Sequence, residues 1–254
     1  MRARSIAILF FQFFGMLALA HQVVAADCPD PDLGPASTTA RNEIWRAEVA
    51  RQAREARKIQ PELILLGDSI TAQLKYRSAD VAFSLYTDVF TTYNFASSGD
   101  NTSNLLWKIE HGVLDRINPS IVMLMIGTND QACKRSRELV EGAIAVIVGS
   151  IRQRLPQSQI VLQSVLPREA DLIDIPALNN ALEKRYRDNP QVHFVDLTAL
   201  FSSGGKLHRE LYKESTLVPP KPLLHPTAKG ARLIAETLMP LLQHLVQSNH
   251  DNSE

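Results

Sequence analysis

Five short runs of apolar and β-branched residues alternate along this chain with segments whose apolar residues recur at helical spacing. The runs cover 63–66, 88–95, 120–126, 159–166 and 192–197. Strands that alternate with helices form a parallel sheet, and right-handed crossovers place the helices on both of its faces. Near-continuous apolar strands fit such a sheet because both faces are covered. We therefore expect one α/β domain, a three-layer α/β/α sandwich around a five-stranded parallel sheet.

The intervening segments predict the helices. They cover 40–58, 105–115, 139–155 and 177–187, and a last helix follows His225-Pro226. We expect irregular structure over 201–224, where glycines and prolines cluster. With 254 residues, of which 45% are hydrophobic, the chain can bury one substantial core. Its formal net charge is zero and it has no basic stripe, so we expect no nucleic-acid partner.

The N-terminal residues are typical of a signal peptide. Arg2 and Arg4 precede an apolar stretch over 6–20, and small residues follow at 23–26. We expect cleavage after residue 26, a single mature domain over 27–254, and a secreted or periplasmic protein with no stable membrane span. The alternative is an uncleaved anchor, although the apolar stretch is short for a membrane span.

The chain has two cysteines, Cys28 and Cys133. In an oxidising compartment they could pair and tie the mature N-terminus to the domain. Two unpaired thiols are the alternative, because a sequence does not show proximity.

The first predicted strand ends abruptly in Gly67, Asp68 and Ser69. Glycine permits backbone angles that a side chain forbids, so we expect a sharp turn there. Asp68 or Ser69 can cap the segment that follows. This turn places the Ser69 hydroxyl at the carboxyl end of a strand, where open parallel sheets bind ligands.

Polar or small residues follow the first three strands, and a histidine precedes the last helix. These residues are Ser69, Gly99, Asn129 and His225. Together they suit acyl transfer, with Ser69 as the nucleophile and His225 as its base. The backbone N–H groups of Ser69 and Gly99 and the side-chain amide of Asn129 can stabilise an oxyanion.

Each of these residues also has a simpler interpretation. Gly99 can serve only a turn, Asn129 can cap its loop, and His225 can be a helix-entry residue. The sequence around Ser69 also suits an ordinary strand-to-helix turn. The catalytic interpretation depends on all four residues falling at equivalent ends of strands.

Four segments of the chain resemble the motif blocks of the GDSL, or SGNH, hydrolases. They are Gly67-Asp68-Ser69-Ile70, the run 94–102 (Asn-Phe-Ala-Ser-Ser-Gly-Asp-Asn-Thr), Gly127-Thr128-Asn129-Asp130, and the run 225–230 (His-Pro-Thr-Ala-Lys-Gly). Their order and spacing agree with the family over roughly 45–242. The resemblance implies the flavodoxin-like SGNH hydrolase fold and ester hydrolysis without a metal or organic cofactor. It is closest to the secreted esterases and the lysophospholipase-like or acetylhydrolase-like members.

One position departs from the family pattern. The family places an aspartate three residues before its histidine, where it orients the imidazole, and this chain has Pro222 there. Glu214 is a candidate to replace that aspartate. The alternatives are a backbone carbonyl that holds His225 in a dyad, or a loss of efficient catalysis.

The sequence thus predicts a serine esterase that releases a small acyl group from a lipid or glycan ester. The first alternative is an O-acetyltransferase on the same fold, in which a sugar hydroxyl replaces water. The second is a non-catalytic protein that binds a glycan or lipid in the same cleft, and Pro222 is the feature that favours it. The pattern predicts no oligomeric state.

Overall fold

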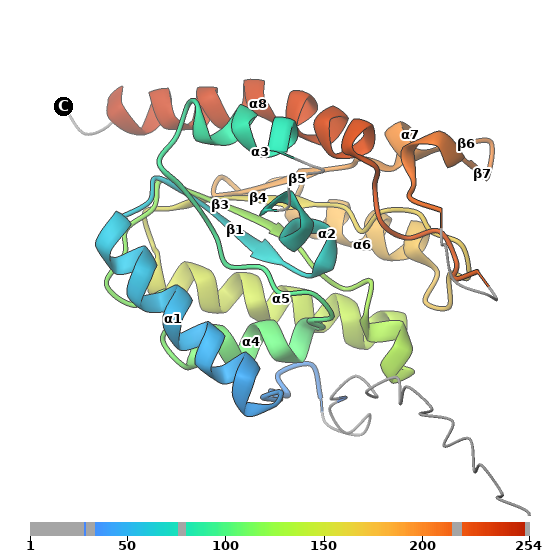
Figure 1. Cartoon of the computed structure of the whole chain (residues 1–254), viewed down its shortest axis with the longest axis horizontal. Coiled ribbons are helices and arrows are strands. Elements are labelled where there is room, and N and C mark those ends of the chain that lie inside the picture. Colours follow the sequence, from blue (N-terminus) through green and yellow to red (C-terminus); the bar gives the residue numbers. More distant parts are fainter. Residues whose placement is uncertain (1–27, 29–33, 76–79, 215–219, 252–254) are drawn as a thin grey trace, which may run out of the picture.

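A five-stranded parallel sheet lies at the centre of the molecule (Figure 1), in a computed structural model that describes residues 28, 34–75, 80–214 and 220–251. The strands are β1 (Leu63–Gly67), β2 (Thr92–Asn94), β3 (Ile121–Met125), β4 (Gln159–Gln163) and β5 (Val192–Val195). Their order is β2-β1-β3-β4-β5, and every neighbouring pair is parallel. This topology confirms the predicted fold class.

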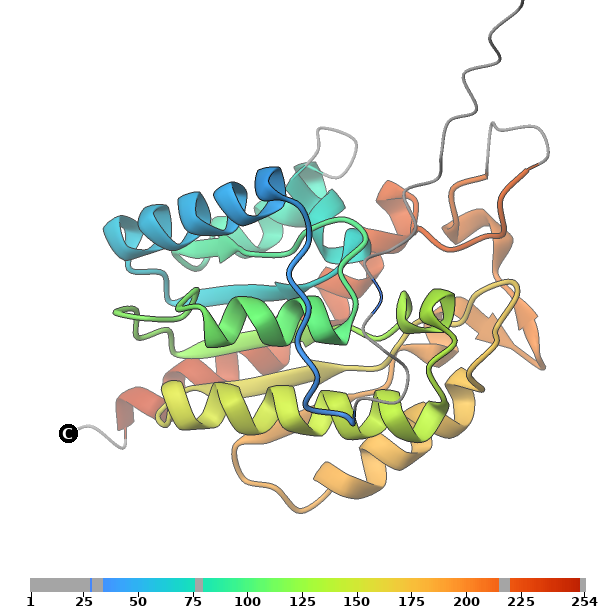
Figure 2. The same ribbon diagram turned by 90° about the horizontal axis from the view of Figure 1, so that it is seen from below.

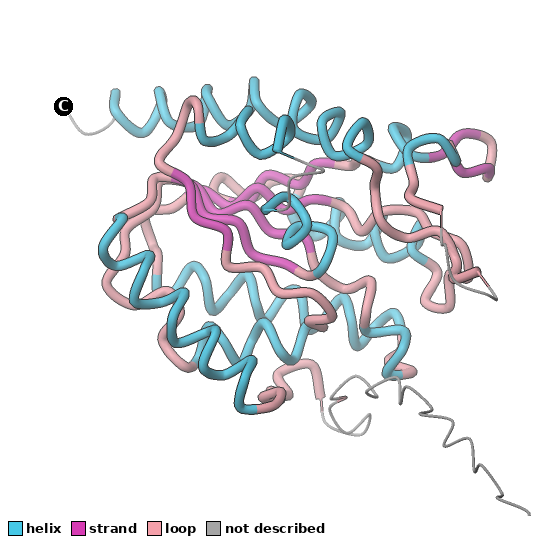
Figure 3. The backbone as a smooth tube through the Cα atoms, in the orientation of Figure 1, coloured by secondary structure: helices cyan, strands magenta, loops and turns pink. Residues whose placement is uncertain are grey.

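Helices cover both faces of the sheet. One face carries α1 (Glu43–Ile59), α4 (Thr102–Glu110), α5 (Arg137–Arg154) and α6 (Ile175–Tyr186), and the other carries α3 (Asp80–Thr87), α7 (Thr198–Phe201) and α8 (Ala228–Asp251). Figure 2 shows α1, α4 and α5 side by side across the first face. Figure 3 shows the strands enclosed between the two helical layers.

The strands divide their side chains between two separate cores. In β1, Ile64 and Leu66 face the layer of α1, α4 and α5, whereas Leu63 and Leu65 face α3 and α8. All four side chains are fully buried. Because successive side chains of a strand point to opposite faces, a strand covered on both faces must be apolar throughout.

The second strand is shorter than its sequence predicts. We expected a strand over 88–95, and β2 covers only Thr92–Asn94. The residues before it form α3, a helix that the sequence patterns did not indicate. Valine, phenylalanine and tyrosine in α3 favour strands, but Tyr86 is buried where α3 packs against α8. Tertiary packing here outweighs local propensity.

The segment over 201–224 contains more regular structure than expected. After α7, the strands β6 (Ser202–Ser203) and β7 (Lys206–Leu207) form a small antiparallel hairpin. Gly204 and Gly205 make its turn, and both have positive φ angles, of 53° and 73°. Such a two-residue turn requires these angles, which favour glycine.

Cys28 and Cys133 form a disulfide with a Cα–Cα distance of 5.3 Å. This result settles the question that the sequence left open in favour of pairing. The bond ties residue 28 to the end of the short 3-10 helix η3 (Asp130–Cys133). The predicted signal peptide lies outside the described residues. Within the described part of the chain, no helix has the length and apolarity needed to cross a membrane.

Candidate active site

The turn after β1 leaves no room for a side chain at Gly67. A Cβ atom there would lie 2.4 Å from the carbonyl oxygen of Met125 and 2.7 Å from Oγ1 of Thr71. The φ angle of Gly67 is not positive, so close packing, rather than an unusual backbone angle, requires glycine. Asp68 then accepts a 2.9 Å hydrogen bond from the N–H of Ile70 and caps the short helix α2 (Ser69–Ala72). The cap fixes Ser69 as the first residue of α2.

Ser69 and His225 are in direct contact. Oγ of Ser69 lies 2.8 Å from Nε2 of His225, although the two residues are 156 positions apart. The Ser69 residue is only 7% exposed, so its hydroxyl is largely shielded from solvent. A serine hydroxyl within hydrogen-bond distance of an imidazole nitrogen is the arrangement of a nucleophile and its base.

Backbone contacts hold His225 at this position. Its carbonyl oxygen accepts a 2.8 Å hydrogen bond from the N–H of Lys213. Tyr212 and Pro226 form an antiparallel bridge on the same segment. His225 is therefore placed by the chain that approaches α8.

Pro222, at the position three residues before His225 where the family has an aspartate, gives His225 no carboxylate. Pro222 and Glu214 are both exposed and line a surface cavity together with Lys221. Within the described residues, no hydrogen bond joins His225 to Glu214 or to any other carboxylate. The contacts of these residues thus give no support to Glu214 as the third member.

Burial and positive charge both act on His225. Burial lowers the pKa of the His225 imidazole, and the nearby charges of Lys213, Arg168 and Lys221 lower it further. A lowered pKa keeps the imidazole neutral at neutral pH, and the neutral form is the one that can accept the Ser69 proton.

The loop after β2 brings Gly99 to the same edge of the sheet. The N–H of Ser97 donates to the carbonyl oxygen of Gly67 at 3.3 Å, so this loop lies against the end of β1. Gly99 has a φ angle of 84°, in the left-handed region that favours glycine.

Asn129 contacts the same loop from the end of β3. Its side-chain Nδ2 donates a 2.9 Å hydrogen bond to the carbonyl oxygen of Asp100. Asn129 stands at the N-cap position of η3, but its side chain makes no capping hydrogen bond. Asn129 therefore does not cap η3 with its side chain, and its amide is directed toward the Gly99 loop.

The family model of the GDSL-like lipases and acylhydrolases matches residues 65–233, a span that contains all four motif segments. The chain belongs to this family. It is accordingly a hydrolase of the esterase or acylhydrolase type.

One relative by sequence and two solved structures that share the fold are similar to this chain. The chain is 29% identical over 218 residues to the platelet-activating factor acetylhydrolase IB subunit beta homolog of Drosophila melanogaster, a match that covers 83% of this chain and 90% of the relative. A GDSL-like lipase from Bacteroides thetaiotaomicron superposes with a TM-score of 0.62 at 20% identity, over 80% of this chain and 97% of that one. A carbohydrate esterase family 3 protein from Talaromyces cellulolyticus gives a TM-score of 0.52 at 21% identity, over 73% and 98%.

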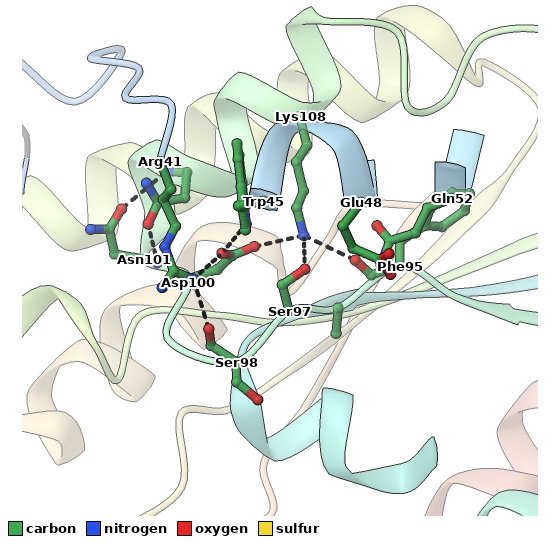
Figure 4. Close-up of polar contacts among 12 residues, drawn as sticks. Arg41, Trp45, Glu48, Gln52, Phe95, Ser97, Ser98, Asp100, Asn101 and Lys108 are labelled. Carbon is green, nitrogen blue, oxygen red and sulfur yellow. Dashed lines mark hydrogen bonds and ion pairs between the residues drawn. The ribbon is translucent and has the colours of Figure 1, made fainter. Parts of the chain in front are cut away.

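A buried group of charges supports the Gly99 loop of this GDSL-like hydrolase (Figure 4). The carboxylate of Asp100 lies 2.6 Å from Nζ of Lys108. It also accepts hydrogen bonds from Nε1 of Trp45 at 2.8 Å and from Nη1 of Arg41 at 3.3 Å. Asp100 and Lys108 are both fully buried. Since the carbonyl of Asp100 receives the Asn129 amide, the same residue joins this network to the candidate oxyanion site.

Lys108 also binds the start of the loop. Its Nζ donates to the carbonyl oxygen of Phe95 at 3.0 Å and to Oγ of Ser97 at 2.7 Å. One ammonium group thus fixes both ends of the segment 95–100, which contains Gly99 (Figure 4). The one sequence signal for this role is a lysine between the apolar residues Leu106 and Ile109 of the helix.

A second buried pair fixes the start of α4. The carboxylate of Asp130 accepts hydrogen bonds from the N–H of Thr102 at 3.0 Å and from its hydroxyl at 2.5 Å. Nη1 of Arg135 lies 3.2 Å from the same carboxylate. These contacts tie η3 to α4, so Asp130 holds a loop in place. Among the described residues, no group of three or more His, Cys, Asp or Glu side chains is placed to hold a metal ion.

Proposed function

We propose that this hydrolase is a serine esterase that works through an acyl-enzyme. The 2.8 Å contact between Oγ of Ser69 and Nε2 of His225 carries the proposal. Ser69 attacks the ester carbonyl carbon while His225 takes its proton, and His225 then gives that proton to the leaving alcohol. Water attacks the acyl-enzyme in the second step, and the same imidazole removes its proton. The acid is then released and Ser69 recovers its hydroxyl.

The oxyanion that forms in both steps needs donors that are already in place. The proposal assigns this role to the backbone N–H groups of Ser69 and Gly99 and to the side-chain amide of Asn129. An amide carries two N–H groups, and Asn129 uses one of them on the carbonyl oxygen of Asp100. The second N–H remains for the oxyanion.

In this proposal Ser69 and His225 act as a catalytic dyad, and Glu214 does not serve as a third member. In enzymes that have a carboxylate behind the histidine, replacing that carboxylate with an amide lowers kcat by about 10⁴-fold, in part through the wrong imidazole tautomer. A dyad with a well-placed neutral histidine keeps the remaining catalytic groups. We therefore expect measurable turnover, slower than that of family members with the aspartate.

The substrate class is an ester with a small acyl group, such as acetate, on a lipid or glycan. The name of the Drosophila relative, an acetylhydrolase, supports an acetyl group. A secreted or periplasmic location is part of the same proposal. The Cys28–Cys133 disulfide supports it, because such bonds persist in oxidising compartments.

The test is turnover of 4-nitrophenyl acetate by the purified mature protein beside three variants. We expect Ser69→Ala and His225→Ala to lose at least about 10³-fold in kcat. Glu214→Gln is the matched control, and it should keep wild-type turnover. A large loss in Glu214→Gln would restore Glu214 as the third member.

Product analysis separates the rival functions. Repeating the reaction with an added sugar acceptor distinguishes release of free acetate from transfer to the sugar, which would identify an O-acetyltransferase. A folded wild-type protein that hydrolyses no ester, yet binds a glycan or lipid equally well after Ser69→Ala, would contradict the esterase. That outcome would favour the binding protein that Pro222 suggests.

A further inference from the structure

A cavity of about 230 Å³ opens beside the candidate oxyanion site. Its lining includes Thr128, Asn129, Gln131, Arg168, Leu172 and Leu224. Asn129 is the proposed oxyanion donor, and Leu224 directly precedes His225. A group bound in this cavity would therefore be part of the substrate, or lie next to it.

Arg168 is held in place on the wall of this cavity. Its Nη1 donates to the carbonyl oxygen of Thr128 at 3.2 Å and to the Thr128 hydroxyl at 3.1 Å. The flanking backbone is fixed as well, because the carbonyl of Pro167 accepts a 2.5 Å hydrogen bond from the Tyr212 hydroxyl. The N–H of Glu169 donates to the carbonyl of Leu223 at 3.1 Å. The guanidinium thus has a fixed position relative to both Asn129 and the segment that carries His225.

Arg168 has no anionic partner among the described residues, whereas the buried Arg135 and the partly buried Arg41 are both paired. The acids whose charge reaches Arg168 are Asp171 and Asp68. The carboxylate of Asp171 accepts hydrogen bonds from the N–H groups of Ile173 and Ile175, just before and at the start of α6. Burial lowers the pKa of Arg168, which reflects the cost of removing an unpaired cation from water.

The side-chain amide of Gln131 is a second donor that lines the same cavity. Gln131 is 5% exposed, and its Oε1 accepts a 2.9 Å hydrogen bond from the N–H of Leu172. Its Nε2 is buried and has no hydrogen-bond partner in the described part of the chain. Buried donors are nearly always hydrogen-bonded in folded proteins, so this amide points to a bound acceptor.

We propose that Arg168 and Gln131 form a subsite for a negatively charged group, a carboxylate or a phosphate, on the substrate. This inference rests on the proposed esterase function and specifies its substrate as an anionic ester. A planar guanidinium matches the oxygens of both groups, and the Gln131 amide adds a neutral donor. The side chains of Leu172 and Leu224 give the cavity apolar surface for the carbons that link the anion to the ester. Lys213 and Lys221, which also act on His225, add positive charge to the approach.

Two pairs of esters test the inference, one for each side of the scissile bond. The anion is on the alcohol side in 3-acetoxybenzoate, whose neutral counterpart is methyl 3-acetoxybenzoate. It is on the acyl side in 4-nitrophenyl hydrogen succinate, whose neutral counterpart is 4-nitrophenyl 4-oxopentanoate. We expect wild type to have a kcat/KM about 10- to 100-fold higher for the anionic member of one pair, as for a charged hydrogen bond.

The variants separate charge recognition from general damage. Arg168→Met should reduce the anionic-to-neutral ratio to near one, and Arg168→Lys should keep part of the preference even if Arg168→Met folds poorly. Arg209→Met is the matched control, because Arg209 is an exposed arginine that is already paired with Glu169 and does not line the cavity. Its ratio should equal that of wild type. Equal rates within both pairs, or a preference that Arg168→Met retains, would overturn the proposal.

A binding measurement keeps this test separate from the esterase proposal. Calorimetry with 3-hydroxybenzoate and with succinate measures anion binding without any turnover. We expect Arg168→Met to bind one of these anions at least ten-fold more weakly than wild type, whether or not wild type hydrolyses any ester. Equal binding by wild type and Arg168→Met, or no binding to either, would contradict the subsite even if the esterase is confirmed.

Discussion

Nζ of Lys108 lies 2.6 Å from Oδ2 of Asp100, and neither side chain is exposed. Burial lowers the pKa of Lys108, and the carboxylate of Asp100 opposes that shift. Taking two charges out of water is costly, so such a pair is weak evidence for stability by itself. The position of the Lys108–Asp100 pair gives a better reason for its presence, since the pair holds the loop that presents Gly99 and receives the Asn129 amide.

Replacing Lys108 with methionine should therefore damage both stability and catalysis. The change leaves the Asp100 carboxylate buried with only part of its partners, which typically costs about 3–5 kcal/mol. For a domain of this size we expect a loss of about 10 °C in Tm. In the folded fraction, we expect a large loss in kcat and a smaller change in KM. The reason is that the loop that presents Gly99 loses the group that fixes both of its ends. The measurements are calorimetric Tm and steady-state kinetics on 4-nitrophenyl acetate.

Lys184→Met provides the comparison, since Lys184 is an exposed lysine of α6. Its Tm and kcat should match those of wild type. A Lys108→Met protein with wild-type kcat would show that the Gly99 loop keeps its shape without the pair.

The pH dependence of kcat/KM should reveal the environment of His225. Catalysis requires the neutral imidazole, and the His225 pKa is lowered by burial and by nearby cations. The acid limb of the profile should therefore lie below the ordinary histidine value of about 6.5. Lys213→Met removes one of these positive charges, so it should move the limb to higher pH. A wild-type limb at or above the ordinary value would mean that a carboxylate acts on His225.

Asp68 should make stability fall as pH rises. Burial, together with the charges of Asp100 and Asp130, raises the pKa of Asp68 to about 7, whereas an unfolded aspartate titrates near 3.9. The folded state then binds this proton more tightly, so the stabilisation is complete below about pH 3.9 and is lost as pH rises through 7. Relative to Asp68→Asn, wild type should lose up to about 4 kcal/mol between pH 4 and pH 8.

The relevant measurement is the difference in Tm between Asp68→Asn and wild type at several pH values. That difference should move in favour of the variant as pH rises. Asp188→Asn, at an exposed site, should show no such trend. A Tm difference that is independent of pH would mean that Asp68 is ionised throughout this range.

Reducing the disulfide should lower the thermal stability. Cys28 and Cys133 are 105 positions apart, and closing a loop of that length stabilises a fold by about 4–5 kcal/mol in the chain-entropy model. We expect a phosphine reductant to lower the Tm of wild type. A Cys28→Ser/Cys133→Ser double variant should start from that lower Tm and not respond to the reductant. Two titratable thiols in the untreated, denatured protein would contradict the pairing.

The residues that sequence reasoning identified share one property. Ser69, Gly99 and Asn129 each follow a strand of a parallel sheet, and that topology alone brings them to one edge. His225 was identified from its place directly before the last helix, and the family resemblance then added support to its pairing with Ser69. The fold class was predictable for a similar reason, since strands buried on both faces leave long apolar runs.

The parts that escaped prediction depend on packing between distant segments. Lys108 acts on Asp100 only because α4 lies over the loop after β2, and α3 forms because Tyr86 packs against α8. Gly67 was recognised, but for the wrong reason, since the constraint is the Met125 carbonyl opposite it. The arrangement of Arg168 beside Asn129 depends on the fold of the segment after β4, which has no sequence signature.

Activation of Ser69 by His225 is tested most directly by labelling the mature protein with a fluorophosphonate probe, which reacts with activated serines. We expect wild type to be labelled at Ser69, Ser69→Ala to remain unlabelled, and His225→Ala to be labelled at least a hundred-fold more slowly. All three proteins should have matching circular dichroism spectra. A correctly folded wild type that remains unlabelled would contradict the claim that His225 activates Ser69 without a carboxylate behind it.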